Sequence, residues 1–223
     1  MTNGDGKGLR EVVTQVVQQV LRTVSFPSLK ELCEIPVGVS ARHVHLSSED
    51  VERLFGPGYQ LRPLVELQPG QYAAKETVTL VGPKGVLQNV RVLGPPRSRT
   101  QVEISRTDGY VLGLNPPVRD SGDLDGSEGV VIVGPRGAVA LAEGVICAAR
   151  HIHMPPEHAA ALGLKQGERV RVRTDGIRPV VFDSVLVRVS EEARTEMHID
   201  TDEANAAGLS TGDKVRLLLD ASE

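Results

Sequence analysis

The spacing of hydrophobic and polar positions changes along the chain at about residue 27. Between Leu9 and Val24 the apolar residues fall three and four positions apart, which predicts an amphipathic helix of about four turns. The segment Ser25-Phe26-Pro27-Ser28 ends this pattern. From Ile35 onward, short valine-rich runs alternate with glycine and proline, which favours β-strands joined by tight turns.

Several segments in this second part repeat one another. The turn Gly82–Gly85 recurs as Gly134–Gly137, and the segment Glu157–Val170 resembles Glu203–Val215. Each of the last two reads as a helical turn, a glycine stop and a strand. The pattern predicts a mainly β fold of two related barrel-like units with short capping helices. The other predicted strands are Ile35–Ser40, Thr77–Val81, Val86–Leu93, Gln101–Ser105, Val130–Val133, Ala138–Leu141 and Val145–Ala148.

Composition narrows the functional classes. The 223 residues suffice for one large domain or two small ones. A net charge of −4 and an aromatic content of 3% argue against a nucleic-acid partner. No apolar run approaches ~18 residues, so we expect no membrane span, and charges and glutamines near the N-terminus argue against a signal peptide. Cys33 and Cys147 form no motif, and we interpret both as small buried residues in a reducing compartment.

The most informative feature is a repeated histidine pair. Ala41–Leu46 reads Ala-Arg-His-Val-His-Leu and Ala149–Met154 reads Ala-Arg-His-Ile-His-Met, which together hold four of the six histidines. Alternate residues of a strand point to the same face, so each pair can supply half of a zinc site. Buried strands with structural histidines are the alternative. The duplication with matching flanks favours two metal sites.

Each pair needs further ligands. We predict His198 as one and interpret His158, in an alanine-rich helix, as a surface residue. One site then needs a carboxylate, for which Glu103 is the strongest candidate because it lies on a predicted strand. Three protein ligands leave an open position, which is typical of catalytic zinc. The weaker carboxylate candidates are Asp108, Asp120, Asp123 and Asp200.

Arginines cluster around these residues. Arg42 and Arg150 precede the two pairs, and Arg91, Arg97, Arg99 and Arg106 flank Glu103. Planar guanidinium groups match phosphate oxygens, so metal and arginine together indicate a phosphate-bearing substrate. We interpret Arg99 as a solvated surface residue.

The sequence also resembles a known enzyme family, the PduL-type phosphotransacylases or phosphate propanoyltransferases. The resemblance extends from about Ile35 to Leu219. The segments that carry it are Val37–Leu46, Gln71–Val78, Thr100–Asp108, Pro117–Asp123, Ala149–Met154 and Met197–Gly208.

The resemblance implies reversible conversion of acyl-CoA and phosphate into acyl-phosphate and CoA, with propanoyl or another short acyl group. It implies two small β-barrels, residues 32–42 with 150–219 and residues 43–149, and two zinc ions. It assigns one zinc to His43, His45 and Glu103, the other to His151, His153 and His198, and phosphate to Arg97. The CoA contacts that it implies are Val39, Ser40, Ala41, Lys84, Arg91 and Asn205. We expect direct transfer without an acyl-enzyme, since no nucleophile motif is present.

The resemblance also bears on the N-terminus. Relatives that serve bacterial microcompartments, such as those for 1,2-propanediol degradation, carry an N-terminal amphipathic helix that directs encapsulation. We therefore expect residues 1–31 to be such a peptide and its linker, with residues 8–24 binding shell or core proteins. A helix that docks on its own domain is the alternative. The expected location is the microcompartment lumen, otherwise the cytoplasm, and the expected assembly is a homodimer.

Two other functions use the same residues. A dinuclear zinc hydrolase would attack thioesters or acyl phosphates with a metal-bound water. A non-catalytic metal-binding assembly module would act through its helix. Six ligands for two metals argue against the second, because closed structural sites have four ligands each.

Overall fold

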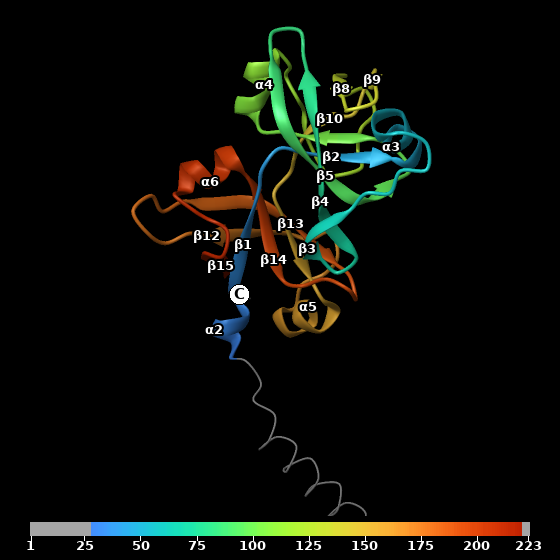
Figure 1. Cartoon of the computed structure of the whole chain (residues 1–223). Helices are drawn as coiled ribbons and strands as arrows, with labels where there is room; N and C mark the ends of the chain where they lie inside the picture. The colour runs from blue at the N-terminus through green and yellow to red at the C-terminus, as the bar shows by residue number, and fades with distance from the viewer. Residues whose placement is uncertain (1–27, 220–223) are drawn as a thin grey trace, which may run out of the picture.

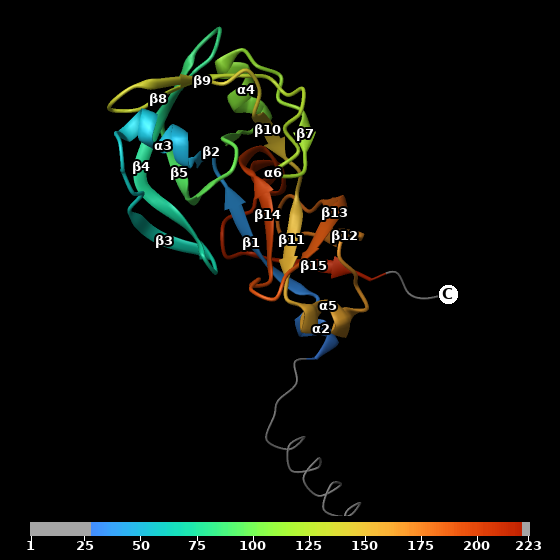
Figure 2. The same ribbon diagram turned by 90° about the vertical axis from the view of Figure 1, so that its right-hand side faces the viewer.

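The computed structural model describes residues 28–219, so the amphipathic helix predicted for Leu9–Val24 lies outside the described residues. Two β-sheets dominate the described part (Figures 1 and 2). One is a closed barrel and the other an open nine-stranded sheet that curves beside it. The predicted mainly β fold with two barrel-like units and short helices is confirmed for these residues. No helix among them is long and apolar enough to cross a membrane.

The closed barrel combines the first described strand with strands from the C-terminal third of the chain. Strand β1 pairs in parallel with β14 and antiparallel with β15, which closes the ring. Valine, isoleucine and methionine side chains fill its interior. In ring order the strands are β1 (Glu34–Ser40), β14 (Glu196–Asp200), β11 (His151–Met154), β13 (Val181–Val189), β12 (Arg169–Arg173) and β15 (Lys214–Leu218).

The open sheet is built from the middle of the chain and has its own hydrophobic core. Its long hairpin of β4 and β5 carries β3 along one edge, where β3 pairs with β4 alone. The strands in order are β7 (Val118–Arg119), β10 (Val145–Ala148), β6 (Gln101–Glu103), β2 (His43–Ser47), β5 (Val86–Arg97), β4 (Gln71–Val81), β8 (Val131–Val133) and β9 (Ala138–Ala140), with β3 (Pro63–Gln68) beside β4.

Short helices follow four central strands in both sheets. In the open sheet β2 leads into α3 (Ser48–Phe55) and β6 into α4 (Arg106–Leu112). In the barrel β11 leads into α5 (Pro156–Leu162) and β14 into α6 (Thr201–Ala207). The helix α2 (Leu29–Leu32) precedes β1. The helical turns predicted after residues 156 and 202 are confirmed, whereas α3, α4, β3, β7 and β13 were not predicted.

The repeated Gly-Pro-x-Gly turn has one structural role in both places. The backbone N–H of Lys84 donates to the carbonyl oxygen of Leu112 at 3.0 Å, and that of Arg136 donates to Leu54 at 3.0 Å. Each turn thus binds the last turn of a helix, α4 or α3. A Cβ on the first glycine of each turn would lie 2.3 or 2.6 Å from that carbonyl oxygen, so the close approach requires glycine.

Two predictions about single residues are wrong. His158 is half-buried, not a surface residue, because α5 packs against α2. Its Nε2 donates to the carbonyl oxygen of Leu32 at 2.9 Å and its Nδ1 accepts from the hydroxyl of Thr195 at 2.7 Å. Cys33 is half-buried rather than buried, whereas Cys147 is buried as predicted, and both are free thiols.

Candidate metal centres

A cavity of about 530 Å³ is lined by residues of both sheets. Strands β1, β11, β13 and β14 of the barrel contribute to its wall, as do β2, β5 and β6 of the open sheet. All six residues predicted as metal ligands line this cavity. Five are histidines on β2, β11 and β14, and the sixth is Glu103 on β6.

The first group consists of His43, His45 and Glu103. Antiparallel pairing of β2 with β6 places His43 directly opposite Glu103. The Nε2 atom of His43 lies 3.3 Å from one carboxylate oxygen, and that of His45 lies 3.7 Å from the other. The three candidate ligand atoms all lie within 4.8 Å of one another.

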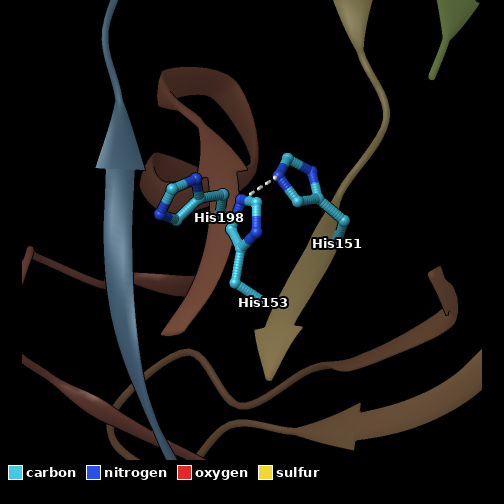
Figure 3. A group of neighbouring side chains, drawn as sticks. All are labelled: His151, His153 and His198. Carbon is cyan, nitrogen blue, oxygen red and sulfur yellow. Dashed lines mark hydrogen bonds between the residues drawn. The ribbon is translucent and has the colours of Figure 1, made fainter. Parts of the chain in front are cut away.

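The second group consists of His151, His153 and His198, whose three imidazoles gather in Figure 3 from two neighbouring strands. Antiparallel pairing of β11 with β14 places His151 directly opposite His198. The Nε2 atoms of His151 and His153 lie 3.1 Å apart, and all three ligand atoms lie within 4.8 Å. His198 therefore holds the register position in the barrel that Glu103 holds in the open sheet.

A backbone carbonyl sets the tautomer of the first histidine in each pair. Nδ1 of His43 donates to the carbonyl oxygen of Ala41 at 2.8 Å, and Nδ1 of His151 donates to Ala149 at 2.9 Å. A carbonyl oxygen only accepts, so the ring proton lies on Nδ1 in both residues. In the neutral ring, Nε2 then carries a lone pair toward the group, the arrangement usual for metal-binding histidines.

Burial keeps most of these imidazoles neutral. It lowers the pKa of His45 and His151 to about 3 and the pKa of His153 to about 4. His43 differs: burial acts to lower its pKa, but the charge and hydrogen bond of Glu103 raise it above its ordinary value. Burial likewise acts to raise the pKa of Glu103, and His43 outweighs it and holds that carboxyl ionised.

This donor set fits a divalent metal ion. Each group turns three lone-pair donors toward one point, nitrogen only in one and two nitrogens with a carboxylate in the other. The Nε2 atoms of His151 and His153 lie 3.1 Å apart, close enough to bind one cation together or to share one ring proton. Burial disfavours the charged imidazolium, so both rings stay neutral and able to bind a cation.

Polar neighbours hold Glu103 in place. Its carboxylate accepts from Gln101 Nε2 and, at 3.0 Å, from the hydroxyl of Ser121. The guanidinium of Arg97 donates to the same Ser121 oxygen at 3.2 Å and lines the cavity. Burial lowers the pKa of Arg97, and the charge of Glu103 acts in the opposite direction. Arg97 thus adjoins the first group without a direct ion pair.

The residues predicted to contact CoA fall in two places. Val39, Ser40, Ala41 and Arg91 line the cavity. The Arg91 guanidinium is held by two carbonyl oxygens of β4, at 3.0 and 2.9 Å.

Lys84 and Asn205 lie away from the cavity wall. The first lies in the turn that binds α4, and the second is exposed on α6, where its carbonyl oxygen accepts from Arg178.

Two of the weaker aspartate candidates, Asp108 and Asp200, have other partners. Asp108 accepts from Arg42 at 3.0 Å and belongs to the capping box of α4. Asp200 caps α6 and accepts from the thiol of Cys147 at 3.2 Å. In the described part of the chain, neither belongs to a group that could hold a metal ion.

Glu196 and Arg188 are among the cavity-wall residues that were not predicted from the sequence. Glu196 accepts from His198 Nε2 at 2.7 Å and from Gln68 Nε2 at 3.1 Å, so it orients the imidazole of the second group. Arg188 lies on β13 opposite His153. The sequence signal for Arg188 was a charged residue inside the apolar run Val185–Val189.

Known proteins resemble the chain over most of its length. The family model described as phosphate propanoyltransferase matches residues 36–210. A phosphate propanoyltransferase of Thermotoga maritima is 57% identical over 197 residues, 87% of this chain and 93% of the relative. One of Priestia megaterium is 53% identical over 90% of each chain, and one of Rhodopseudomonas palustris is 50% identical over 94% and 96%. The chain therefore belongs to the phosphate propanoyltransferase family and is an acyltransferase.

Proposed function

We propose that the protein is a phosphotransacylase that transfers a short acyl group, propanoyl or a near homologue, between CoA and phosphate. Family membership over residues 36–210 is the observation that carries this proposal. The cavity supports it, because it combines two three-donor groups with arginine side chains able to bind phosphate oxygens.

We propose that each group holds one zinc ion, through His43, His45 and Glu103 in one case and His151, His153 and His198 in the other. Bound zinc lowers the pKa of a coordinated thiol and stabilises negative charge on oxygen.

The protein's own side chains orient the reactants. Arg97, next to the first group, is placed to bind phosphoryl oxygens and to stabilise charge that develops on them. Val39, Ser40 and Ala41 border the cavity where CoA would enter, with Arg91 near them. In the synthetic direction a sulfur–carbon bond forms to the acyl carbon and the carbon–oxygen bond to phosphate breaks. The thiol proton balances the released phosphate, and no acyl-enzyme forms.

The direct test is thioester formation from CoA and propanoyl phosphate by the purified, zinc-loaded protein, followed by ultraviolet absorbance. We expect turnover in the wild type and a fall of at least about 100-fold in Arg97→Ala, because that variant loses a charge that stabilises the transition state. His43→Ala should also lose its zinc. Arg99→Ala is the matched control, since Arg99 is exposed and pairs with Asp125 and Glu143 outside the cavity.

The same assay separates the alternatives. Release of free CoA from propanoyl-CoA without any phosphate requirement would indicate a dinuclear hydrolase instead. Absence of any turnover with propanoyl or acetyl phosphate, despite two bound zinc ions, would contradict the transferase and leave the assembly module.

We further propose that residues 8–24 direct the enzyme into a bacterial microcompartment by binding shell or core proteins, and that the enzyme is a homodimer. Residues 1–31 would then be a tether to two folding units, residues 32–42 with 150–219 and residues 43–149. Deletion of residues 1–30 should leave turnover unchanged and abolish co-purification with shell proteins. Loss of turnover on deletion would instead indicate a helix docked on its own domain.

A further inference from the structure

Arg188 differs from the other arginines that line the cavity. Arg42 pairs with Asp108 at 3.0 Å, Arg91 donates to two carbonyl oxygens, and Arg97 donates to Ser121. In the described part of the chain, the Arg188 guanidinium has no hydrogen bond and no carboxylate oxygen within 4.0 Å. It is half-buried, on the strand next to His153.

Such a guanidinium is costly to bury without a partner. Burial lowers the pKa of Arg188, and the charges of Asp120 and Glu103 only partly offset it. Asp120 makes no direct ion pair with Arg188. Its Oδ2 lies 3.9 Å from Arg169, and its buried Oδ1 has no hydrogen-bond partner.

The charge of Arg188 also acts on the histidines of the second group and on Arg97. After burial, the charge of Arg188 is the main factor that lowers the pKa of His151, and it also lowers that of His153. It also lowers the pKa of Arg97, so the two guanidinium groups repel each other across the cavity. Arg97 acts in the same way on His43 and His45. One arginine therefore flanks each ligand group, and an anion between them would relieve the repulsion.

We propose that Arg188 is a second phosphate-binding residue, which donates to the oxygens of inorganic phosphate or of the acyl-phosphate beside the His151, His153 and His198 group. This inference rests on the proposed function. The barrel supplies Arg188 and the open sheet supplies Arg97, so the phosphoryl group is held from both sides of the cavity. The planar guanidinium can donate to two phosphate oxygens at once, which lysine cannot do.

The test measures phosphate separately from the acyl carrier. In the direction that consumes propanoyl-CoA and phosphate, Arg188→Ala should raise the KM for phosphate about 10- to 100-fold, because a charged hydrogen bond is lost. The KM for propanoyl-CoA and the zinc content should stay unchanged. A second readout needs no turnover: calorimetric titration of the zinc-loaded protein with inorganic phosphate should show the same loss of affinity. Arg99→Ala is again the control.

Arg188→Lys keeps the charge and is the test variant to use if Arg188→Ala does not fold. It should show an intermediate phosphate affinity, since a single ammonium replaces the two-pronged donor. Phosphate affinity equal to the wild type in the folded variants would overturn the proposal. A wild type that binds phosphate through Arg188 but transfers no acyl group would instead contradict the proposed function and leave the phosphate site standing.

Discussion

Replacement of Glu103 by glutamine tests the first metal site with the smallest change in shape. Glu103 is the one carboxylate among the six candidate ligands, and its oxygens lie 3.3 and 3.7 Å from the Nε2 atoms of His43 and His45. Gln101 and Ser121 hold it in place, so the change removes a pre-positioned anion rather than a mobile one. We expect Glu103→Gln to bind one zinc ion per chain where the wild type binds two.

The expected loss of stability follows from the loss of zinc affinity, because zinc that binds only the folded chain stabilises it. Loss of a polar group that only supports a metal ligand typically lowers metal affinity 10- to 100-fold, and loss of a ligand itself should reach at least the upper end. A 100-fold weaker site removes about 2.7 kcal/mol of zinc-dependent stabilisation at saturating wild-type conditions. For a chain of this size, the increase in Tm on adding zinc should therefore be about 5–11 °C smaller in the variant than in the wild type.

The assay combines zinc content after dialysis with thermal unfolding in the presence and absence of zinc. Glu143→Gln is the matched control, because Glu143 pairs with Arg99 outside the cavity. Two zinc ions per chain and an undiminished gain in Tm for Glu103→Gln would refute the assignment of this carboxylate as a ligand.

Three further predictions follow from the geometry. In metal-stripped protein, the three histidines with strongly lowered pKa take up protons on unfolding, so stability is present above pH 6.5 and is lost as the pH falls toward about 4. Urea midpoints that do not differ between pH 7 and pH 5 would contradict this. A Cβ in Gly38→Ala would lie 3.0 Å from Glu196 Cδ and His198 Cδ2, and should weaken the second zinc about 10- to 100-fold. Competition with a chromophoric chelator measures this, and equal loss at both sites would count against it. Gly134→Ala, whose Cβ would lie 2.6 Å from the Leu54 carbonyl oxygen, should destabilise the fold by about 1–3 kcal/mol in urea unfolding. A urea midpoint equal to that of the wild type would contradict this, and would show that α3 moves to accommodate the added Cβ.

Much of the site was predictable because it depends on local geometry. Two histidines at alternate positions of a strand share a face whatever the strand pairs with, so His43 with His45 and His151 with His153 followed from spacing alone. The helical turns after β11 and β14 followed from their glycine stops, because an αL position ends a helix locally.

Spacing alone could not choose the third ligands. Elimination and strand position favoured His198 and Glu103, with four aspartates left open, and the resemblance to a family assigned each of the two to its own histidine pair. In the structure, the antiparallel registers of β2 with β6 and of β11 with β14 bring these two residues opposite the first histidine of each pair. Register depends on the pairing of segments up to about 60 residues apart. The periodicity of either segment alone does not determine it.

The sequence by itself determined two duplicated half-sites, a mainly β chain and a surplus of arginine near them. Only the tertiary structure decided which arginines face the cavity and which have partners. Arg42 and Arg91 have partners and Arg99 lies outside the cavity, whereas Arg188 faces the cavity with no ion-pair partner among residues 28–219. Whether a buried charge is compensated depends on atoms from distant strands within about 4 Å of it. No pattern along a single segment encodes that distance.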